Sequence, residues 1–290
     1  MNANVPELAV LKPKLKSMWM SGDYAHFATY LVKGATEFLS LCDITVGTTL
    51  LDVACGAGQT AIPLARRGAR VTGVDIATNL IEVARKRAQA EGLTIQFDEG
   101  DAEELPYDDA SFDVVFSLIG AMFAPQPQKV ADEMARVCRP GGRIIMGNWT
   151  PGGFVGQMFK TIAKHAPPAP GVPSAVLWGD VATVRDRLGD YVSDLTITSR
   201  MYPFEYPFGP SEVVEFFRQY YGPTNRAFGS LDADGQAALH RDLEELWTRH
   251  NQATDGTVHV EGEYIDVQAV RREVEFDLDG LSPRRVGSLV

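Results

Sequence analysis

The feature that most constrains this chain is a glycine-containing turn at Asp52–Gly58, which directly follows the apolar residues Thr49–Leu51. A buried strand that runs into glycines lets the backbone approach a ligand closely. The helix that follows opens with unpaired N–H groups and a positive dipole end. The next apolar run, Val71–Val74, ends in Asp75, where a carboxylate can accept hydrogen bonds from both hydroxyls of a ribose. These features predict a site for an adenosine-containing cofactor.

Composition and charge narrow the class of protein. The 290 residues, 45% of them hydrophobic, can bury a full core, and the net charge of −11 argues against a broad phosphate-binding surface. The longest apolar stretch, Val114–Ala124, is far shorter than the roughly 20 residues that span a bilayer, and no signal-peptide core is present. Cys42, Cys55 and Cys138 lack the spacing of a disulfide framework or a zinc site. We therefore expect a cytoplasmic protein with no metal, no nucleic-acid partner and no membrane insertion.

Strand and helix patterns alternate between residues 48 and 149, which predicts a parallel sheet with crossover helices. The expected strands of this part lie near 49–54, 70–75, 93–98, 112–118 and 142–149. After Trp149 the alternation breaks; the later elements are a strand near 193–203, helices from Pro210 and near 232–250, and a closing strand over Val258–Val270. The expected fold is a Rossmann-like α/β sheet of seven mostly parallel strands, with helices on both faces and a lid.

Five segments follow from this pattern. They are an N-terminal helical cap (1–45), a cofactor-binding core (46–149), a substrate-side insertion and lid with the sixth strand (150–255), a closing strand (256–272) and a C-terminal tail (273–290). We expect the tail to add little to the active site.

The glycine turn alone leaves the cofactor class open. Gly56, Gly58 and Ala61 fit the G-x-G-x-x-A pattern of a dinucleotide site, which would suit an NAD-dependent oxidoreductase. Asp52 favours another cofactor, because a carboxylate just before the glycines repels a pyrophosphate and attracts an α-amino group.

Five sequence blocks in a fixed order extend this pattern. They are Leu51–Gly58, Val74–Ile76, Gly100–Tyr107, Phe112–Val115 and Arg136–Gly142. Together they resemble the class I S-adenosylmethionine-dependent methyltransferases, of the small-molecule kind related to the ubiquinone and menaquinone biosynthesis enzymes. The resemblance covers about residues 45–149. Ala54 departs from the family pattern, which usually has its first glycine there; a side chain this small should still admit the ligand.

The resemblance implies which residues surround the methionine end of the cofactor. Asp52 and the backbone of Gly56–Gly58 would hold it, beside Ala54, and Ser117 at the end of the fourth strand would line the region of the methyl donor. Tyr24 belongs to a segment that resembles the part of related enzymes that folds over the cofactor, and it would cap the methionine carboxylate. Alternatively, this segment is an amphipathic helix packed on the sheet.

The resemblance also implies the adenosine contacts. Asp75 would accept both ribose hydroxyls, and Ile76 would pack on one adenine face. Asp101 would accept a hydrogen bond from the adenine amino group, and the Ala102 N–H would reach a ring nitrogen. Alternatively, these aspartates, like Asp52, are helix caps or solvated loop residues.

The rest of the chain offers weaker candidates. An aromatic cluster after residue 200 is either a wall of an apolar substrate pocket or part of the core. Its proposed wall residues are Tyr202, Tyr206, Phe217, Tyr220 and Tyr221. His26 and His165 are candidate catalytic bases, although a lone histidine is more often structural.

The favoured function is methyl transfer from S-adenosylmethionine to a small, fairly apolar acceptor, at O, N or C, mainly by proximity and alignment. The alternatives are an NAD-dependent oxidoreductase and a non-catalytic sensor that binds the cofactor. A nucleic-acid methyltransferase is disfavoured, because Ser117–Gly120 lacks the Asn/Asp-Pro-Pro-aromatic signature of the amino-methylating enzymes. The sequence leaves the oligomeric state open.

Overall fold

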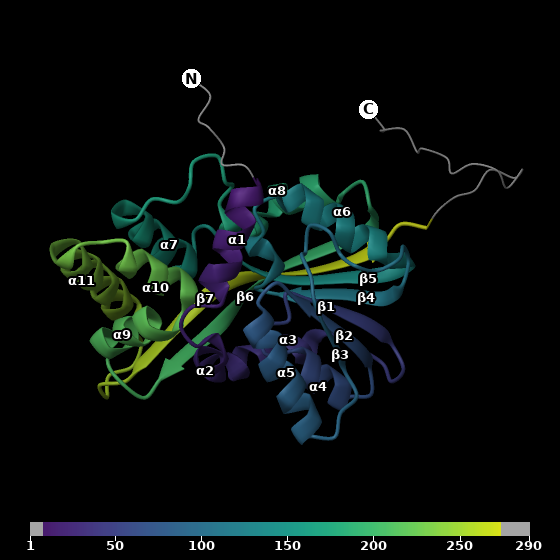
Figure 1. The fold of residues 1–290 in the computed structure, drawn as a ribbon, viewed down its shortest axis with the longest axis horizontal. Coiled ribbons are helices and arrows are strands. Elements are labelled where there is room, and N and C mark those ends of the chain that lie inside the picture. The colour runs from purple at the N-terminus through teal and green to yellow at the C-terminus, as the bar shows by residue number, and fades with distance from the viewer. Residues whose placement is uncertain (1–7, 274–290) are drawn as a thin grey trace, which may run out of the picture.

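A seven-stranded mixed sheet forms the centre of the molecule in the computed structural model, which describes residues 8–273 (Figure 1). The strand order is β3-β2-β1-β4-β5-β7-β6. The strands are β1 (Thr49–Val53), β2 (Arg70–Asp75), β3 (Gln96–Glu99), β4 (Phe112–Leu118), β5 (Cys138–Trp149), β6 (Val192–Tyr206) and β7 (Val258–Arg271). The first five strands pair in parallel and β7 is antiparallel to both β5 and β6, so the predicted mostly parallel sheet is confirmed.

Helices cover both faces of the sheet. In Figure 1, α3, α4 and α5 lie on one side, and α6 and α8 lie on the other. The α-helices are α1 (Leu8–Trp19), α2 (Tyr24–Phe27), α3 (Val32–Leu41), α4 (Ala61–Arg66), α5 (Thr78–Ala90), α6 (Pro127–Val137), α7 (Phe154–His165), α8 (Val181–Leu188), α9 (Pro210–Tyr220), α10 (Gly222–Gly229) and α11 (Ala233–His250). Three short 3₁₀ segments are η1 (Ala28–Leu31), η2 (Ala121–Phe123) and η3 (Ala175–Gly179).

Burial explains why the central strands were recognisable. Four of the five residues of β1 and five of the seven residues of β4 are buried, without the alternation of a half-exposed strand. Such continuous apolar runs are typical of parallel strands that are covered on both faces. On α6, Val130, Met134 and Val137 form the buried stripe, and Pro127 occupies the first turn, where its missing N–H costs least.

Two strand boundaries differ from the sequence prediction for local reasons. β5 begins at Cys138, four residues early, because Cys138 already pairs with Phe112 before the register shifts. β3 begins at Gln96 rather than near residue 93, because the N–H of Leu93 still bonds to the Ala88 carbonyl at the end of α5.

The segment 150–255 is joined to the sheet through its own strand and helices. It supplies β6, and its helix α8 packs between α6 and the sheet edge, with Val184 and Leu188 fully buried. Helices α7, α9, α10 and α11 form a group at one end of the molecule (Figure 1). α10 was not expected from the sequence. The C-terminal tail after residue 273 lies outside the described residues.

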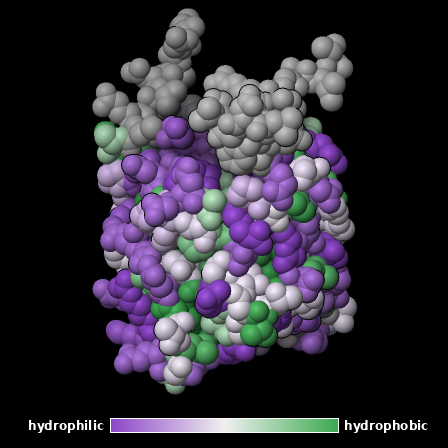
Figure 2. Space-filling model, turned by 90° about the vertical axis from the view of Figure 1, so that its right-hand side faces the viewer, coloured by the Kyte–Doolittle hydropathy of each residue, from purple (hydrophilic) through white to green (hydrophobic). Residues whose placement is uncertain are grey.

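The surface is mixed in character. Figure 2 shows one side of the molecule, where hydrophobic residues form small groups among hydrophilic ones. Large exposed apolar side chains such as Val46 and Met201 come from separate elements, which is usual for a folded domain. Within residues 8–273, no helix has both the length and the apolar character needed to cross a bilayer. The same residues gather no cluster of three or more His, Cys, Asp or Glu side chains that could hold a metal ion.

Candidate active site

The loop between β1 and α4 turns sharply, because Ala54 (φ 59°), Gly56 (54°) and Gly58 (81°) all have positive φ. Asp75, the last residue of β2, fixes this loop. Its Oδ2 accepts a hydrogen bond from the Gly56 N–H at 2.8 Å, and its Oδ1 accepts one from the Ala77 N–H, also at 2.8 Å. Burial raises the pKa of Asp75. Both carboxylate oxygens keep further lone pairs, so the group can still accept hydrogen bonds from a ligand.

Asp52 lies behind the same loop rather than on its ligand side. Its carboxylate accepts hydrogen bonds from the Thr60 hydroxyl and from the Ala61 N–H at the start of α4, and only 1% of the residue is exposed. Burial raises its pKa to about 7. Asp52 is absent from the lining of both pockets described below. In the structure Asp52 therefore anchors the loop to α4, and its expected contact with a ligand amino group stays a prediction.

Ala54 and Gly120 face each other across the end of the sheet. A Cβ atom on Gly120 would lie 2.5 Å from the Ala54 Cβ and 2.7 Å from the Ala54 carbonyl oxygen. The neighbouring Ile119 also has positive φ, 61°. An alanine in this turn is therefore accommodated by a glycine on the facing loop after β4, a compensation that the sequence alone did not reveal.

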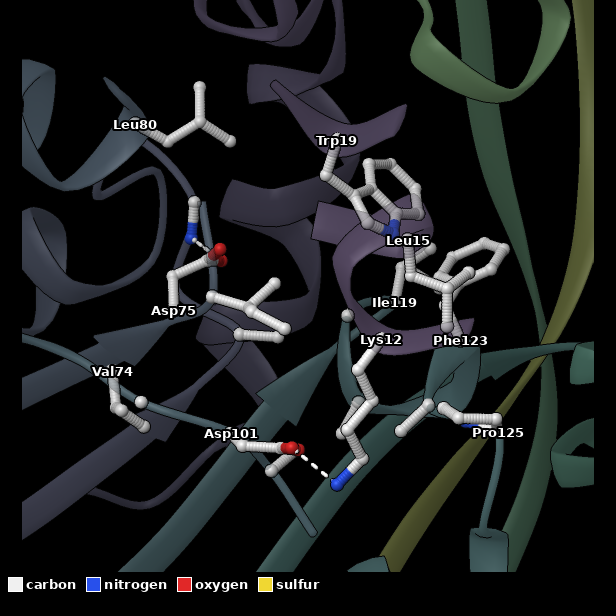
Figure 3. Close-up of a pocket in the computed structure, with 18 of the residues that line it drawn as sticks. Lys12, Leu15, Trp19, Val74, Asp75, Leu80, Asp101, Ile119, Phe123 and Pro125 are labelled. Carbon is white, nitrogen blue, oxygen red and sulfur yellow. Dashed lines mark hydrogen bonds and ion pairs between the residues drawn. The ribbon is translucent and has the colours of Figure 1, made fainter. Parts of the chain in front are cut away.

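The first pocket opens beside this turn and holds about 810 Å³ of empty space (Figure 3). Asp75 and Asp101 lie along the same side of it in the close-up, with Phe123 and Pro125 across the cavity. Seven of the ten residues expected at the cofactor line it: Tyr24, Ala54, Gly56, Asp75, Ile76, Asp101 and Ala102. Asp101 also accepts a hydrogen bond from the Glu103 N–H at 2.9 Å, so it orders its own loop as well as facing the pocket.

The other three expected cofactor residues support the pocket from behind. Ser117 donates to the Val53 carbonyl at 2.8 Å and accepts from the Ala121 N–H at 3.0 Å, and it is 1% exposed. A Cβ on Gly58 would meet Ile62 at 3.0 Å, so this glycine permits close packing of the turn on α4. With Asp52, these residues shape the loops and are not among the residues that line the first pocket, so their expected contacts with the cofactor stay predictions.

Helix α1 packs against the first pocket and contributes residues that the sequence analysis missed. The Lys12 Nζ lies 2.6 Å from the Asp101 Oδ2 and 2.8 Å from the Glu103 Oε2 (Figure 3). Trp19 packs edge-on against Phe123, with 4.9 Å between the ring centroids. Lys12, Leu15 and Trp19 all line the pocket, and their spacing places them on one helical face. That spacing is the signal that could have identified them.

A second pocket of about 530 Å³ adjoins the first and shares five lining residues with it. The shared residues are Tyr24, Ala54, Gly56, Ile119 and Gly120. Its remaining lining is Ala28, Leu31, Ala35, Cys55, Gln59, Thr60, Leu118, Trp149 and Tyr202. None of these side chains is an aspartate, glutamate, lysine, arginine or histidine. The Gln59 Nε2 is buried without a hydrogen-bond partner among the described residues, so the pocket wall holds one donor available to a ligand.

Tyr202 is the one expected substrate-wall residue that lines this second pocket. Its hydroxyl donates to the Leu31 carbonyl at 2.5 Å, and its ring fits against Gly34, where a Cβ would lie 2.3 Å away. The hydrogen bond and the packing join β6 to the N-terminal helical segments and hold this wall of the second pocket in place.

The other four expected wall residues lie elsewhere. Tyr206, Phe217 and Tyr221 are buried at 2%, 3% and 7% exposure, and they pack against other aromatic rings of the core. Tyr220 lines an open groove on the surface of α9 instead. None of these four residues lines the first or the second pocket, and the expectation that they contact the substrate stays a prediction.

Neither histidine candidate lines either pocket. His26 is exposed on α2 and packs edge-on against Tyr220, with 4.7 Å between the rings. His165, at the end of α7, hydrogen-bonds to Asp242 of α11 at 2.8 Å. Both placements correspond to the structural role of a lone histidine.

Comparisons with known proteins indicate the same kind of protein as the geometry of the site does. Residues 51–146 match the family model described as a methyltransferase domain. An uncharacterized protein of Mycobacterium tuberculosis is 40% identical over 235 residues, which cover 80% of this chain and 86% of that protein. The demethylmenaquinone methyltransferase of Deinococcus radiodurans is 42% identical over 124 residues, covering 41% of this chain and 51% of that enzyme. The chain is a class I S-adenosylmethionine-dependent methyltransferase.

A solved structure extends the likeness over most of this methyltransferase. A putative methyltransferase from Bacillus halodurans superimposes with a TM-score of 0.57 at 20% identity, covering 82% of this chain and 98% of that one. This likeness concerns the fold alone.

The residues present suit S-adenosylmethionine, the cofactor of this methyltransferase family. The first pocket offers two carboxylates, Asp75 and Asp101, for hydroxyl and amino donors. Gly120 leaves room where the two pockets meet, because a side chain there would meet Ala54.

The methyltransferase should lose stability as pH rises from about 4 to about 7, in part through Asp52. Its pKa is about 7 in the folded protein, against an ordinary value of 3.8, so the folded state binds the extra proton between these values. Stability from this group is full below about pH 4 and is lost by about pH 7, an effect on the order of 4 kcal/mol. Urea unfolding at pH 5 and pH 8 should show a smaller difference in Asp52→Asn than in the unchanged protein. An equal difference in both would contradict the assignment.

Proposed function

We propose that this methyltransferase acts on a small, fairly apolar, uncharged acceptor that binds in the second pocket. The observation that carries the proposal is the lining of that pocket, which is mostly aliphatic and aromatic and has no formally charged side chain. A buried pocket of this kind favours an uncharged ligand, because burying an unpaired charge costs far more than burying apolar surface. The name of the Deinococcus enzyme, which specifies a ring compound, supports an aromatic acceptor.

For the cofactor we propose roles that follow the pocket lining. Asp75 holds the ribose, Asp101 and the Ala102 N–H hold the adenine, and Ile76 packs on it. Tyr24 lines both pockets, which supports a role for its phenol as a hydrogen-bond donor to the methionine carboxylate. Burial raises the pKa of Tyr24, which keeps this donor proton in place at neutral pH.

S-adenosylmethionine supplies a methyl group that is already activated by the positive charge on its sulfur. The task left to the chain is to position the acceptor and exclude water. Trp149 and Tyr202 supply flat walls for the acceptor, and the Gln59 amide supplies a polar contact that can orient it. No carboxylate or imidazole lines the second pocket, so alignment is the main contribution of the side chains there.

A panel of simple phenols and hydroquinones, each paired with its carboxylate-bearing analogue, tests the acceptor class. Formation of S-adenosylhomocysteine should be detected with uncharged members and should be at least tenfold slower with their charged analogues. Faster turnover of the charged analogues would overturn the proposal.

Narrowing the second pocket should impair acceptor binding selectively. Ala35→Val adds two methyl groups at a lining position, which should raise the acceptor KM by about tenfold or more and leave the Kd for S-adenosylhomocysteine unchanged. Ala237→Val is the matched control, because Ala237 is exposed on α11 and far along the chain from the pocket residues. If Ala35→Val weakened cofactor binding as much as acceptor binding, the second pocket would belong to the cofactor.

A further inference from the structure

Strand β6 forms an outer edge of the sheet, and its far side has no partner strand within residues 8–273. Every residue pairing of β6 is with β7. Most side chains from Ser193 to Met201 are exposed, and Met201 reaches 56%. A long edge with unpaired N–H and C=O groups can add another strand, and proteins usually interrupt, charge or cover such an edge.

Two features of β6 would interrupt pairing with a further strand, and they lie at the two ends of its exposed part. A register shift lies between Val192 and Asp194, and Pro203 removes a backbone donor at the other end. Between these points, the run Asp194–Tyr202 contains no glycine, proline or lysine. The middle of the edge is therefore regular enough to pair with a further strand.

The side chains of this run are complementary to a second copy of themselves. When two copies pair antiparallel about Ile197, Asp194 of each lies opposite Arg200 of the other. Thr196 then lies opposite Thr198, and the two Ile197 side chains meet on the axis. Opposite charges, threonine pairs and apolar pairs in directly opposed positions each favour pairing.

Neighbouring registers lose this match. A two-fold axis perpendicular to the sheet keeps each side chain on its own face, so the register changes in steps of two residues. The next registers place Asp194 opposite Thr198 or Tyr202 and form no ion pair. Arg200 is also held in position, because its Nε donates to the buried Asp266 at 3.0 Å while 35% of its side chain stays exposed.

We propose that two copies of this methyltransferase pair along β6, antiparallel and centred on Ile197, and so join two seven-stranded sheets into one. The dimer is isologous, the commonest form of symmetric association. The proposed partner is a second copy of the chain, because Asp194 of each β6 strand then lies opposite Arg200 of the other. This ion pair forms only in the register centred on Ile197.

Cysteine crosslinking of the full chain tests the register. The native Cys42, Cys55 and Cys138 are buried, so an added surface cysteine reports on its own position. In Ile197→Cys the two thiols face each other across the axis, at a Cα separation that suits a disulfide. In Met201→Cys they lie roughly 26 Å apart, eight residues along the paired strands. Mild oxidation should give at least tenfold more covalent dimer with Ile197→Cys, and equal yields, or no dimer from Ile197→Cys, would overturn the proposal.

Sedimentation analysis provides a second test that needs no oxidation. The unchanged protein should shift from monomer to dimer as its concentration rises, and Asp194→Lys should weaken the dimer at least tenfold by facing Arg200 with a like charge. Asp190→Lys carries the same charge change outside the paired run and should leave the dimer unchanged. A protein that stays monomeric at every concentration, or that is affected equally by the two variants, would contradict the β6 dimer.

Discussion

Asp75→Ala should weaken the binding of S-adenosylhomocysteine by about a hundredfold. Its carboxylate is buried, lines the first pocket and already accepts the Gly56 and Ala77 N–H groups. The variant loses two hydrogen bonds from ribose hydroxyls to a charged group, at about 1.5–3 kcal/mol each, and also the anchor of the loop. Isothermal titration calorimetry measures the effect directly.

Two further variants test whether the loss of affinity is specific to the Asp75 carboxylate. Asp75→Asn keeps the shape of the side chain and should lie between the unchanged protein and Asp75→Ala, because it retains one oxygen acceptor and loses the charge. Asp190→Ala removes an exposed carboxylate and should bind the product normally. Unchanged affinity in Asp75→Ala, with a normal unfolding transition, would place the ribose elsewhere.

Gly120→Ala should lower kcat/KM by about a hundredfold. Its new Cβ would lie 2.5 Å from the Ala54 Cβ and 2.7 Å from the Ala54 carbonyl oxygen, so one of the two loops must move. Both loops line both pockets, and a displacement of about 1 Å in such a site can cost about a hundredfold in rate. Overpacking should also cost about 1–3 kcal/mol of stability.

Gly229→Ala is the matched control for this variant. A Cβ on Gly229, the last residue of α10, would meet nothing within 4 Å, so activity should stay within twofold of the unchanged protein. Normal activity in Gly120→Ala would contradict this prediction. It would show that the loops that carry Ala54 and Gly120 can move apart without misaligning the acceptor and the methyl donor.

The parallel core could be predicted from the sequence because its signals are local. Strands β1 and β4 are continuous apolar runs, and the turn after β1 carries its glycines within one short stretch. The resemblance to the methyltransferases, carried by short sequence blocks, placed residues that follow β1, β2, β3 and β4 around one cofactor. In the structure these residues come together because the carboxyl ends of parallel strands share one edge of the sheet. Seven of the ten expected cofactor residues do line the first pocket.

The expected and the observed surroundings differ where the direction of a side chain depends on distant packing. Asp52 lies in the expected strand but bonds to Thr60 and α4, on the far side of the turn. Tyr206 and Phe217 belong to the expected aromatic group, yet β6 and α9 turn these rings toward Trp247 and the core. The Lys12 to Asp101 ion pair joins residues 89 positions apart, which no local pattern encodes.

The ion pairs of α1 have a consequence for the order of events in each catalytic cycle. Lys12 pairs with Asp101, which lines the first pocket, and with the neighbouring Glu103, while Lys16 pairs with Glu99. In the proposed cofactor site, Asp101 therefore has two competing donors, the Lys12 ammonium of α1 and the adenine amino group. When S-adenosylhomocysteine leaves and S-adenosylmethionine enters, the Asp101 carboxylate exchanges one of these donors for the other. Because partly exposed ion pairs weaken as ionic strength rises, we expect cofactor exchange to depend on salt concentration more strongly than methyl transfer does.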